Sequence, residues 1–84
     1  MSRRTYSGEE VRKVLVNHGP FYLHDITGSH YILRWDAPND HDSRSRTVVV
    51  PDHDELRPGT LREIATQAGA KNFQNFLDWL NRKL

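Results

Sequence analysis

Five histidines and no cysteine set the range of chemistry open to this chain of 84 residues. Histidine can take up or release a proton near neutral pH because its reference pKa is about 6.5. His30 directly follows the turn-forming residues Gly28 and Ser29, and His53 lies between acidic residues after Pro51. Both are candidates for proton transfer, although an arbitrary histidine in a surface turn more often has no chemical role.

The remaining histidines do not complete a metal-binding pattern. His18 ends a predicted helix, His24 lies in a predicted strand, and His41 lies in a polar stretch. There is no H-E-x-x-H motif or other close ligand spacing, and the Asp-His-Asp runs at 40–42 and 52–54 fall in predicted loops. The lack of cysteine excludes thiolate catalysis and cysteine-bound zinc. We therefore predict neither a metal site nor a cofactor.

The total charge does not point to nucleic acid or membrane as a partner. Twelve Lys and Arg residues against eleven Asp and Glu residues give a formal charge of +1. Any cationic site must therefore come from local placement. Five arginines near the predicted sheet edge and second helix could form a positive rim for phosphates or could simply be solvated: Arg34, Arg44, Arg46, Arg57 and Arg62. Tyr22 and Tyr31 could stack on unpaired bases or pack in the core.

A capped helix is predicted near the N-terminus. Ser7 and Glu10 form an S-x-x-E capping box, in which each side chain can accept the other residue's backbone N–H. Apolar residues follow at helical spacing, so we expect a helix over residues 8–18. Gly19 is expected to provide a left-handed cap, and Pro20 stops the helix.

Residues 21–35 predict a β-hairpin. They are rich in β-branched and aromatic side chains, interrupted at Gly28-Ser29, which suits a two-residue type II′ turn. His30 is then the first residue of the second strand. Alternation places His30, Ile32 and Arg34 on one face, and Tyr31, Leu33 and Trp35 on the face expected to meet the core.

The second half predicts one strand and two helices. Residues 36–45 form a polar loop, Thr47–Val50 is a short β run that ends at Pro51, and Pro58 suits the first position of a helix capped by Gly69. Asn72 is a predicted N-cap for a third helix over about 72–83.

This order predicts an α+β fold: a two-layer α-β-β-β-α sandwich with a three-stranded antiparallel sheet and an extra C-terminal helix. The two main helices should cover one face of the sheet and leave the other to solvent or ligand. The length suits one domain over residues 1–84.

Two short stretches carry a family resemblance. They are Gly28-Ser29-His30-Tyr31 and Val50-Pro51-Asp52-His53, the latter leading to Leu56-Arg57-Pro58-Gly59-Thr60-Leu61-Arg62. In type and order, over about residues 7–69, the chain resembles the HicA (YcfA-like) mRNA interferase toxins. The resemblance implies a fold similar to a double-stranded-RNA-binding domain, ribonuclease activity on mRNA, and neutralisation by a HicB-type antitoxin.

The resemblance also implies roles for particular residues. It makes His30 the catalytic general base or acid, held by the Gly28-Ser29 turn. His53 matches the second histidine position and is either a general-acid partner or phosphate ligand, or an ordinary loop residue. Supporting or RNA-binding roles are expected for Ser29, Gly28, His53, Arg34, Arg46, Arg57 and Arg62.

Two other functions remain open at this point. One is a non-catalytic RNA-binding module of the same fold, in which His30 would affect affinity alone. The other is a protein-interaction domain that uses its C-terminal helix, with Trp79 as anchor. For all three we expect a cytoplasmic protein without membrane contact, because no apolar run approaches the ~20 residues of a membrane span.

Overall fold

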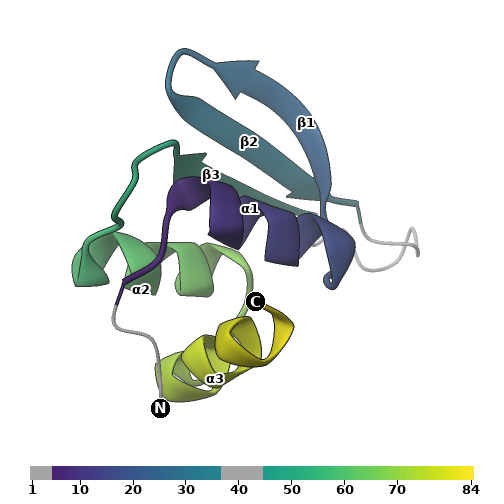
Figure 1. Ribbon diagram of the computed structural model, residues 1–84. Helices are drawn as coiled ribbons and strands as arrows, with labels where there is room; N and C mark the ends of the chain where they lie inside the picture. Colours follow the sequence, from purple (N-terminus) through teal and green to yellow (C-terminus); the bar gives the residue numbers. More distant parts are fainter. Residues whose placement is uncertain (1–4, 37–44) are drawn as a thin grey trace.

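The computed structural model describes residues 5–36 and 45–84, and the elements found there follow the predicted order (Figure 1). Most of the loop predicted over residues 36–45 lies outside the described residues, and so do His41 and Arg44. The elements are α1 (Gly8–Asn17), β1 (Tyr22–Thr27), β2 (His30–Trp35), β3 (Arg46–Pro51), α2 (Pro58–Gln67) and α3 (Phe73–Lys83).

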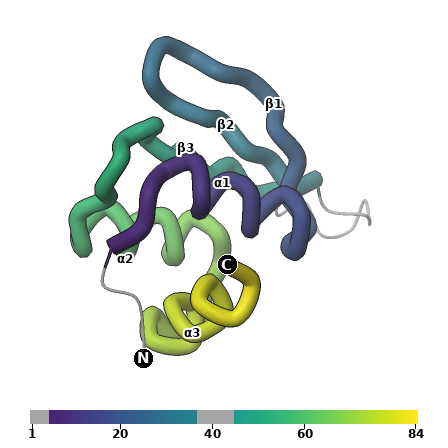
Figure 2. Tube along the Cα trace, viewed as in Figure 1, coloured from purple at the N-terminus to yellow at the C-terminus, as the bar shows by residue number. Residues whose placement is uncertain are grey.

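The strands form an antiparallel sheet in the order β1-β2-β3. Thr27 pairs with His30, so Gly28 and Ser29 are the two turn residues at the tip of the hairpin, which Figure 2 traces. Gly28 has a φ of +58° and Ser29 has no positive φ, as a type II′ turn requires. The turn prediction is therefore confirmed.

The two faces of the sheet have the predicted assignment. Leu33 on β2 lies opposite Val48 on β3, and both are fully buried beneath the helices. His30 lies opposite Pro51 and Arg34 opposite Thr47, on the face that the helices leave uncovered. In β1, the register shifts between Leu23 and Asp25, so His24 is an extra residue in a bulge that the alternation pattern did not indicate.

Both predicted helix starts in the first two-thirds of the chain are confirmed. Ser7 accepts the N–H of Glu10 at 3.0 Å, and Glu10 accepts the N–H of Ser7 at 3.0 Å, which completes the capping box. Helix α2 begins at Pro58. It ends at Gln67, and Gly69 follows with a φ of +89° and an N–H that donates to the carbonyl of Thr66 at 3.0 Å.

The prediction that Gly19 is a left-handed cap is wrong. Gly19 has no positive φ, and α1 ends with the N–H of His18 donating to the carbonyl of Val14 at 2.9 Å. A Cβ at Gly19 would lie 2.7 Å from the Leu15 carbonyl oxygen and 3.4 Å from the Trp79 ring. Glycine therefore permits close packing here rather than an unusual backbone conformation.

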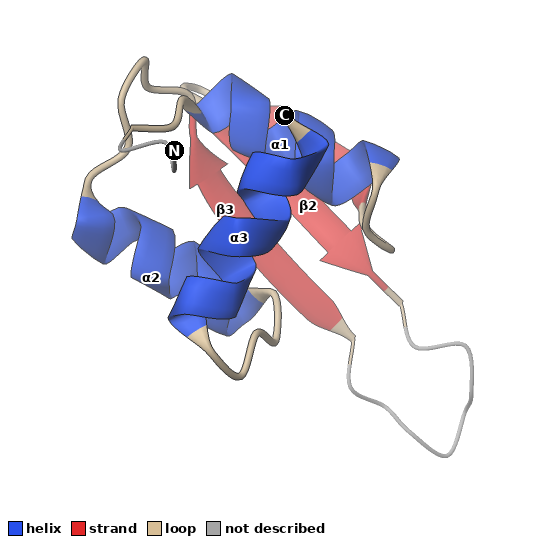
Figure 3. Ribbon diagram, turned by 60° about the horizontal axis from the view of Figure 1, so that its bottom comes forward, coloured by secondary structure: helices blue, strands red, loops and turns tan. Residues whose placement is uncertain are grey.

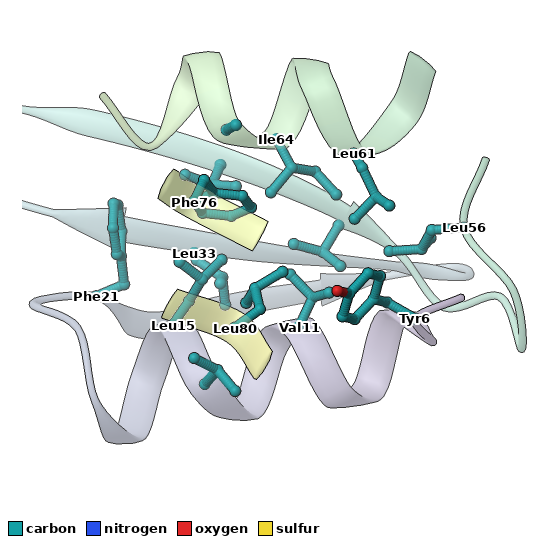
Figure 4. Packing of buried hydrophobic residues seen from close by; sticks show 14 residues of the cluster. Tyr6, Val11, Leu15, Phe21, Leu33, Leu56, Leu61, Ile64, Phe76 and Leu80 are labelled. Carbon is teal, nitrogen blue, oxygen red and sulfur yellow. The ribbon is translucent and has the colours of Figure 1, made fainter. Parts of the chain in front are cut away.

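All three helices lie on one side of the sheet, and α3 crosses over α1 and α2 (Figure 3). Asn72 caps α3 as predicted, by accepting the N–H of Asn75 at 3.0 Å. Phe76 and Leu80 on α3 are buried in the same cluster as Leu15 and Ile64 (Figure 4). The α+β fold with its three-stranded antiparallel sheet is thus confirmed. No helix in the described part of the chain is both long and apolar enough to span a membrane.

Candidate active site

His30 is an exposed residue at the beginning of β2, on the uncovered face of the sheet. The turn before it is tied to the chain that leaves β3, because the N–H of Asp52 donates to the carbonyl of Ser29 at 2.6 Å. Ladder pairing with Thr27 on one side and Pro51 on the other fixes the backbone of His30. The sheet therefore holds an accessible imidazole at a well-defined position.

A pocket of about 190 Å³ lies beside His30, where β3 meets α2. Its walls combine apolar and polar side chains from three elements. They are His30 of β2, Val49 and Pro51 of β3, and Thr60, Glu63, Ile64 and Gln67 of α2. A small group could therefore be enclosed within reach of the imidazole.

Gln67 closes one wall of this pocket. Its side-chain oxygen accepts the N–H of Val49 at 2.9 Å. Strand β3 is an edge of the sheet, so no neighbouring strand accepts this N–H. The side chain of Gln67 on α2 accepts it instead. The bond thus fixes α2 beside the sheet edge.

Sequence reasoning missed Glu63 and Gln67 as site residues. Together with Thr60 they are spaced three and four residues apart, so they share one face of α2 next to its buried stripe. That spacing was a signal for a polar helix face, although it could not show that the face meets β3.

Arg34 lies on the same face as His30 but at the other end of β2, about 13 Å along the strand at ~3.3 Å per residue. Its guanidinium is 3.1 Å from the Asp36 carboxylate and 3.5 Å from the Thr47 hydroxyl. The Tyr22 hydroxyl donates to the same carboxylate at 2.8 Å. Arg34 is therefore engaged by an acidic partner away from the pocket.

These contacts shift the protonation of all three groups. The hydrogen bonds from Tyr22 and then Arg34 lower the pKa of Asp36 below its ordinary value. The hydrogen bond to Asp36 raises the pKa of Tyr22 and also raises the pKa of Arg34. The triad thus stays as a carboxylate, a neutral phenol and a guanidinium at neutral pH.

The other candidate arginines do not line the pocket. The Arg46 guanidinium lies against Gly69 at the end of α2, and Arg46 pairs with Trp35 on the helix-covered face. The Arg62 guanidinium stacks on the Phe73 ring at 4.3 Å. Arg57 is exposed directly before α2. A continuous positive rim around His30 is therefore not assembled from these residues.

His53 is exposed near the turn but does not line the pocket. Its backbone carbonyl accepts the N–H of Gly8 at 2.8 Å, which joins this loop to the start of α1. His24 is in the β1 bulge and His18 caps α1. Among the described residues, no three His, Asp or Glu side chains are grouped so that they could hold a metal ion.

The remaining aromatic candidates have different surroundings. Tyr22 is exposed on the open face, whereas Tyr31 is half-buried on the helix side with the Arg12 guanidinium 4.8 Å from its ring. Trp79 is half-buried and lines a second, mainly apolar pocket with Leu15, Pro20 and Phe76 among its walls. Trp79 therefore contributes to the seam between α1 and α3.

Fold and site together define a small α+β domain with helices on one sheet face and an accessible histidine on the other, beside a pocket at the sheet edge where β3 meets α2. The family described as the HicA toxin of bacterial toxin-antitoxin systems matches residues 8–70. This chain belongs to the HicA toxin family, and an antitoxin is accordingly its expected partner. Comparison with curated proteins and with solved structures gives no match.

Proposed function

We propose that this HicA-family toxin is an endoribonuclease that cleaves mRNA without a metal ion and that His30 is its catalytic residue. The observation that supports this proposal is the accessible imidazole of His30 on a fixed turn, beside a pocket open to ligand. No separate nucleophile is required for RNA cleavage, because the ribose 2′-hydroxyl is itself the nucleophile and a general base can activate it.

The proposed reaction begins when His30 accepts the proton of a ribose 2′-hydroxyl. The 2′-oxygen then forms a bond to the adjacent phosphorus and the bond from phosphorus to the 5′-oxygen breaks. The departing 5′-oxygen takes up a proton from water, and the His30 imidazolium releases its proton to solvent. One product ends in a 2′,3′-cyclic phosphate and the other begins with a 5′-hydroxyl. The reaction requires no metal ion and no co-reactant.

In this proposal, residues around the hairpin tip bind the RNA backbone. Ser29, His53 and Arg57 are exposed, and the Asp52–Ser29 hydrogen bond places the loop that contains His53 near the turn. We assign contacts with RNA phosphates to these three residues. Gly28 forms the tight turn that leaves space for the RNA strand. Arg34, Arg46 and Arg62, which are engaged elsewhere, would contribute only longer-range attraction.

The partner in this proposal is a HicB-type antitoxin that neutralises the toxin in the cytoplasm, where mRNA is translated. Membership of the HicA toxin family supports an antitoxin partner. The proposed mRNA substrate supports a cytoplasmic location, because mRNA is translated there. An antitoxin that covers the His30 pocket would block access for RNA directly.

The proposal can be tested in cells that express the chain from an inducible promoter. Wild-type protein should stop growth and shorten cellular mRNAs, and co-expression of the antitoxin should relieve both effects. The His30→Ala variant should accumulate as folded protein without either effect. If folded His30→Ala protein shortens mRNA as wild type does, the catalytic assignment is wrong. If wild-type protein arrests growth without RNA cleavage, the domain is an RNA-binding module instead.

A further inference from the structure

The pocket beside His30 is lined by both apolar and polar side chains. Val49, Pro51 and Ile64 provide apolar surface, while Thr60, Glu63 and Gln67 from α2 provide polar atoms. Proteins hold an unpaired nucleobase through apolar or aromatic contact with its face and hydrogen bonds to its edge. The pocket therefore has the chemical composition of a base-binding site.

The Glu63 side chain disfavours binding of a phosphate inside the pocket. Glu63 is exposed and has no ion-pair partner among the described residues, so its carboxylate faces solvent as an acceptor only. A negative carboxylate repels a phosphate and favours N–H groups. A base can therefore enter this space while the phosphate stays outside, next to His30.

Gln67 has an amide nitrogen that is available as a hydrogen-bond donor. Its oxygen is occupied by the N–H of Val49 at 2.9 Å, and turning the amide over would leave that N–H unpaired. The side-chain nitrogen has no protein acceptor in the described part of the chain. It is therefore available to donate to a carbonyl oxygen of a ligand.

Glu63 and Gln67 are four residues apart on α2, which places their Cβ atoms about 5–6 Å apart on one helix face. An acceptor-only carboxylate thus lies beside an amide whose nitrogen is available to donate. Guanine presents the complementary edge, since its ring N–H and amino group are adjacent donors and its carbonyl oxygen is next to them. Adenine, cytosine and uracil each offer a carboxylate one such donor group.

We infer that this pocket binds one unpaired guanine, with Glu63 and Gln67 as specificity-determining residues for the RNA that His30 cleaves. The inference rests on the proposed function for its biological meaning. Its test nevertheless needs only a measurement of RNA binding and no measurement of cleavage. It assigns a base preference to α2, whose polar face the cleavage chemistry itself does not use.

The test uses 2′-fluoro heptanucleotides, which lack the attacking hydroxyl and so cannot be cleaved. Each is a run of uridines with one variable central base, and binding to the purified full chain is followed by fluorescence anisotropy. Guanine should bind about ten-fold more tightly than adenine, cytosine, uracil or inosine, because one good bidentate pair distinguishes bases by about this factor or more. Inosine keeps the carbonyl oxygen and ring N–H but lacks the amino group.

The Glu63→Gln variant should lose the preference for guanine over inosine, whereas Glu55→Gln, with the same charge change outside the pocket, should keep it. Equal binding of guanine and inosine by wild type would overturn the inference, and the inosine comparison needs no variant. A guanine preference that survives in folded Glu63→Gln, or no binding of any heptamer, would overturn it too. Cleavage of ordinary RNA in those cases would leave the proposed nuclease function intact.

Discussion

Gln67 of α2 and Val49 of β3 are joined by a hydrogen bond of 2.9 Å between the side-chain oxygen and the backbone N–H. One side chain therefore satisfies one backbone N–H at the free edge of the sheet and holds the helix that forms a wall of the His30 pocket. Stability and site geometry depend on the same contact.

Replacing Gln67 with Ala should lower the free energy of unfolding by about 1 kcal/mol, because the Val49 N–H loses its partner. Chemical denaturation followed by circular dichroism measures this change. Gln74→Ala is the matched control, since Gln74 is exposed and bonds only to Asp78 on its own helix. Equal losses in the two variants would show that the Val49 bond adds no stability.

Two glycines of the same region should respond in opposite directions to alanine. Gly69 has a φ of +89°, so Gly69→Ala should cost about 1–2 kcal/mol of stability. Gly59 is helical with no atom within 4 Å of an added Cβ, so Gly59→Ala should raise stability by about 0.5–1 kcal/mol. Thermal unfolding of both variants checks the signs, and a stabilising Gly69→Ala would contradict the left-handed assignment.

The Tyr22–Asp36 contact should be visible in NMR titrations. Asp36→Asn should bring the pKa of Tyr22 down toward 10.0, and Tyr22→Phe should bring the pKa of Asp36 up toward 3.8. Unchanged titration of Tyr22 in Asp36→Asn would contradict the hydrogen bond.

The same contact predicts a pH dependence of stability. Because the pKa of Asp36 is lowered in the folded state, its contribution is complete above the unfolded-state pKa and disappears as pH falls through the folded-state pKa. Because the pKa of Tyr22 is raised, its contribution is complete below the unfolded-state pKa and disappears as pH rises through the folded-state pKa. Wild type and Asp36→Asn should therefore converge in stability at low pH.

Local signals in the sequence were sufficient for the order of the helices and strands. Ser7 and Glu10 predicted the start of α1, Pro58 predicted the start of α2, and Gly28-Ser29 predicted the turn before His30. Each of these features depends on neighbouring residues alone. For that reason they could be read without knowledge of the packing.

Tertiary relationships were not accessible in the same way. The pocket arises because α2 lies along the edge of β3, and no local pattern showed that Glu63 would face the same space as His30. The bulge at His24 and the close packing at Gly19 likewise depend on contacts distant in sequence. The arginines could be identified as candidates from the sequence, but the side chains and backbone they contact could not.

The rate at which purified protein cleaves a 5′-labelled single-stranded RNA tests the central claim most directly. His30→Ala should lower the initial rate by about 10²-fold or more, as expected when a general acid-base group is lost. His24→Ala, which changes an exposed histidine outside the pocket, should retain the rate of wild type. Cleavage by folded His30→Ala at the wild-type rate would contradict the account.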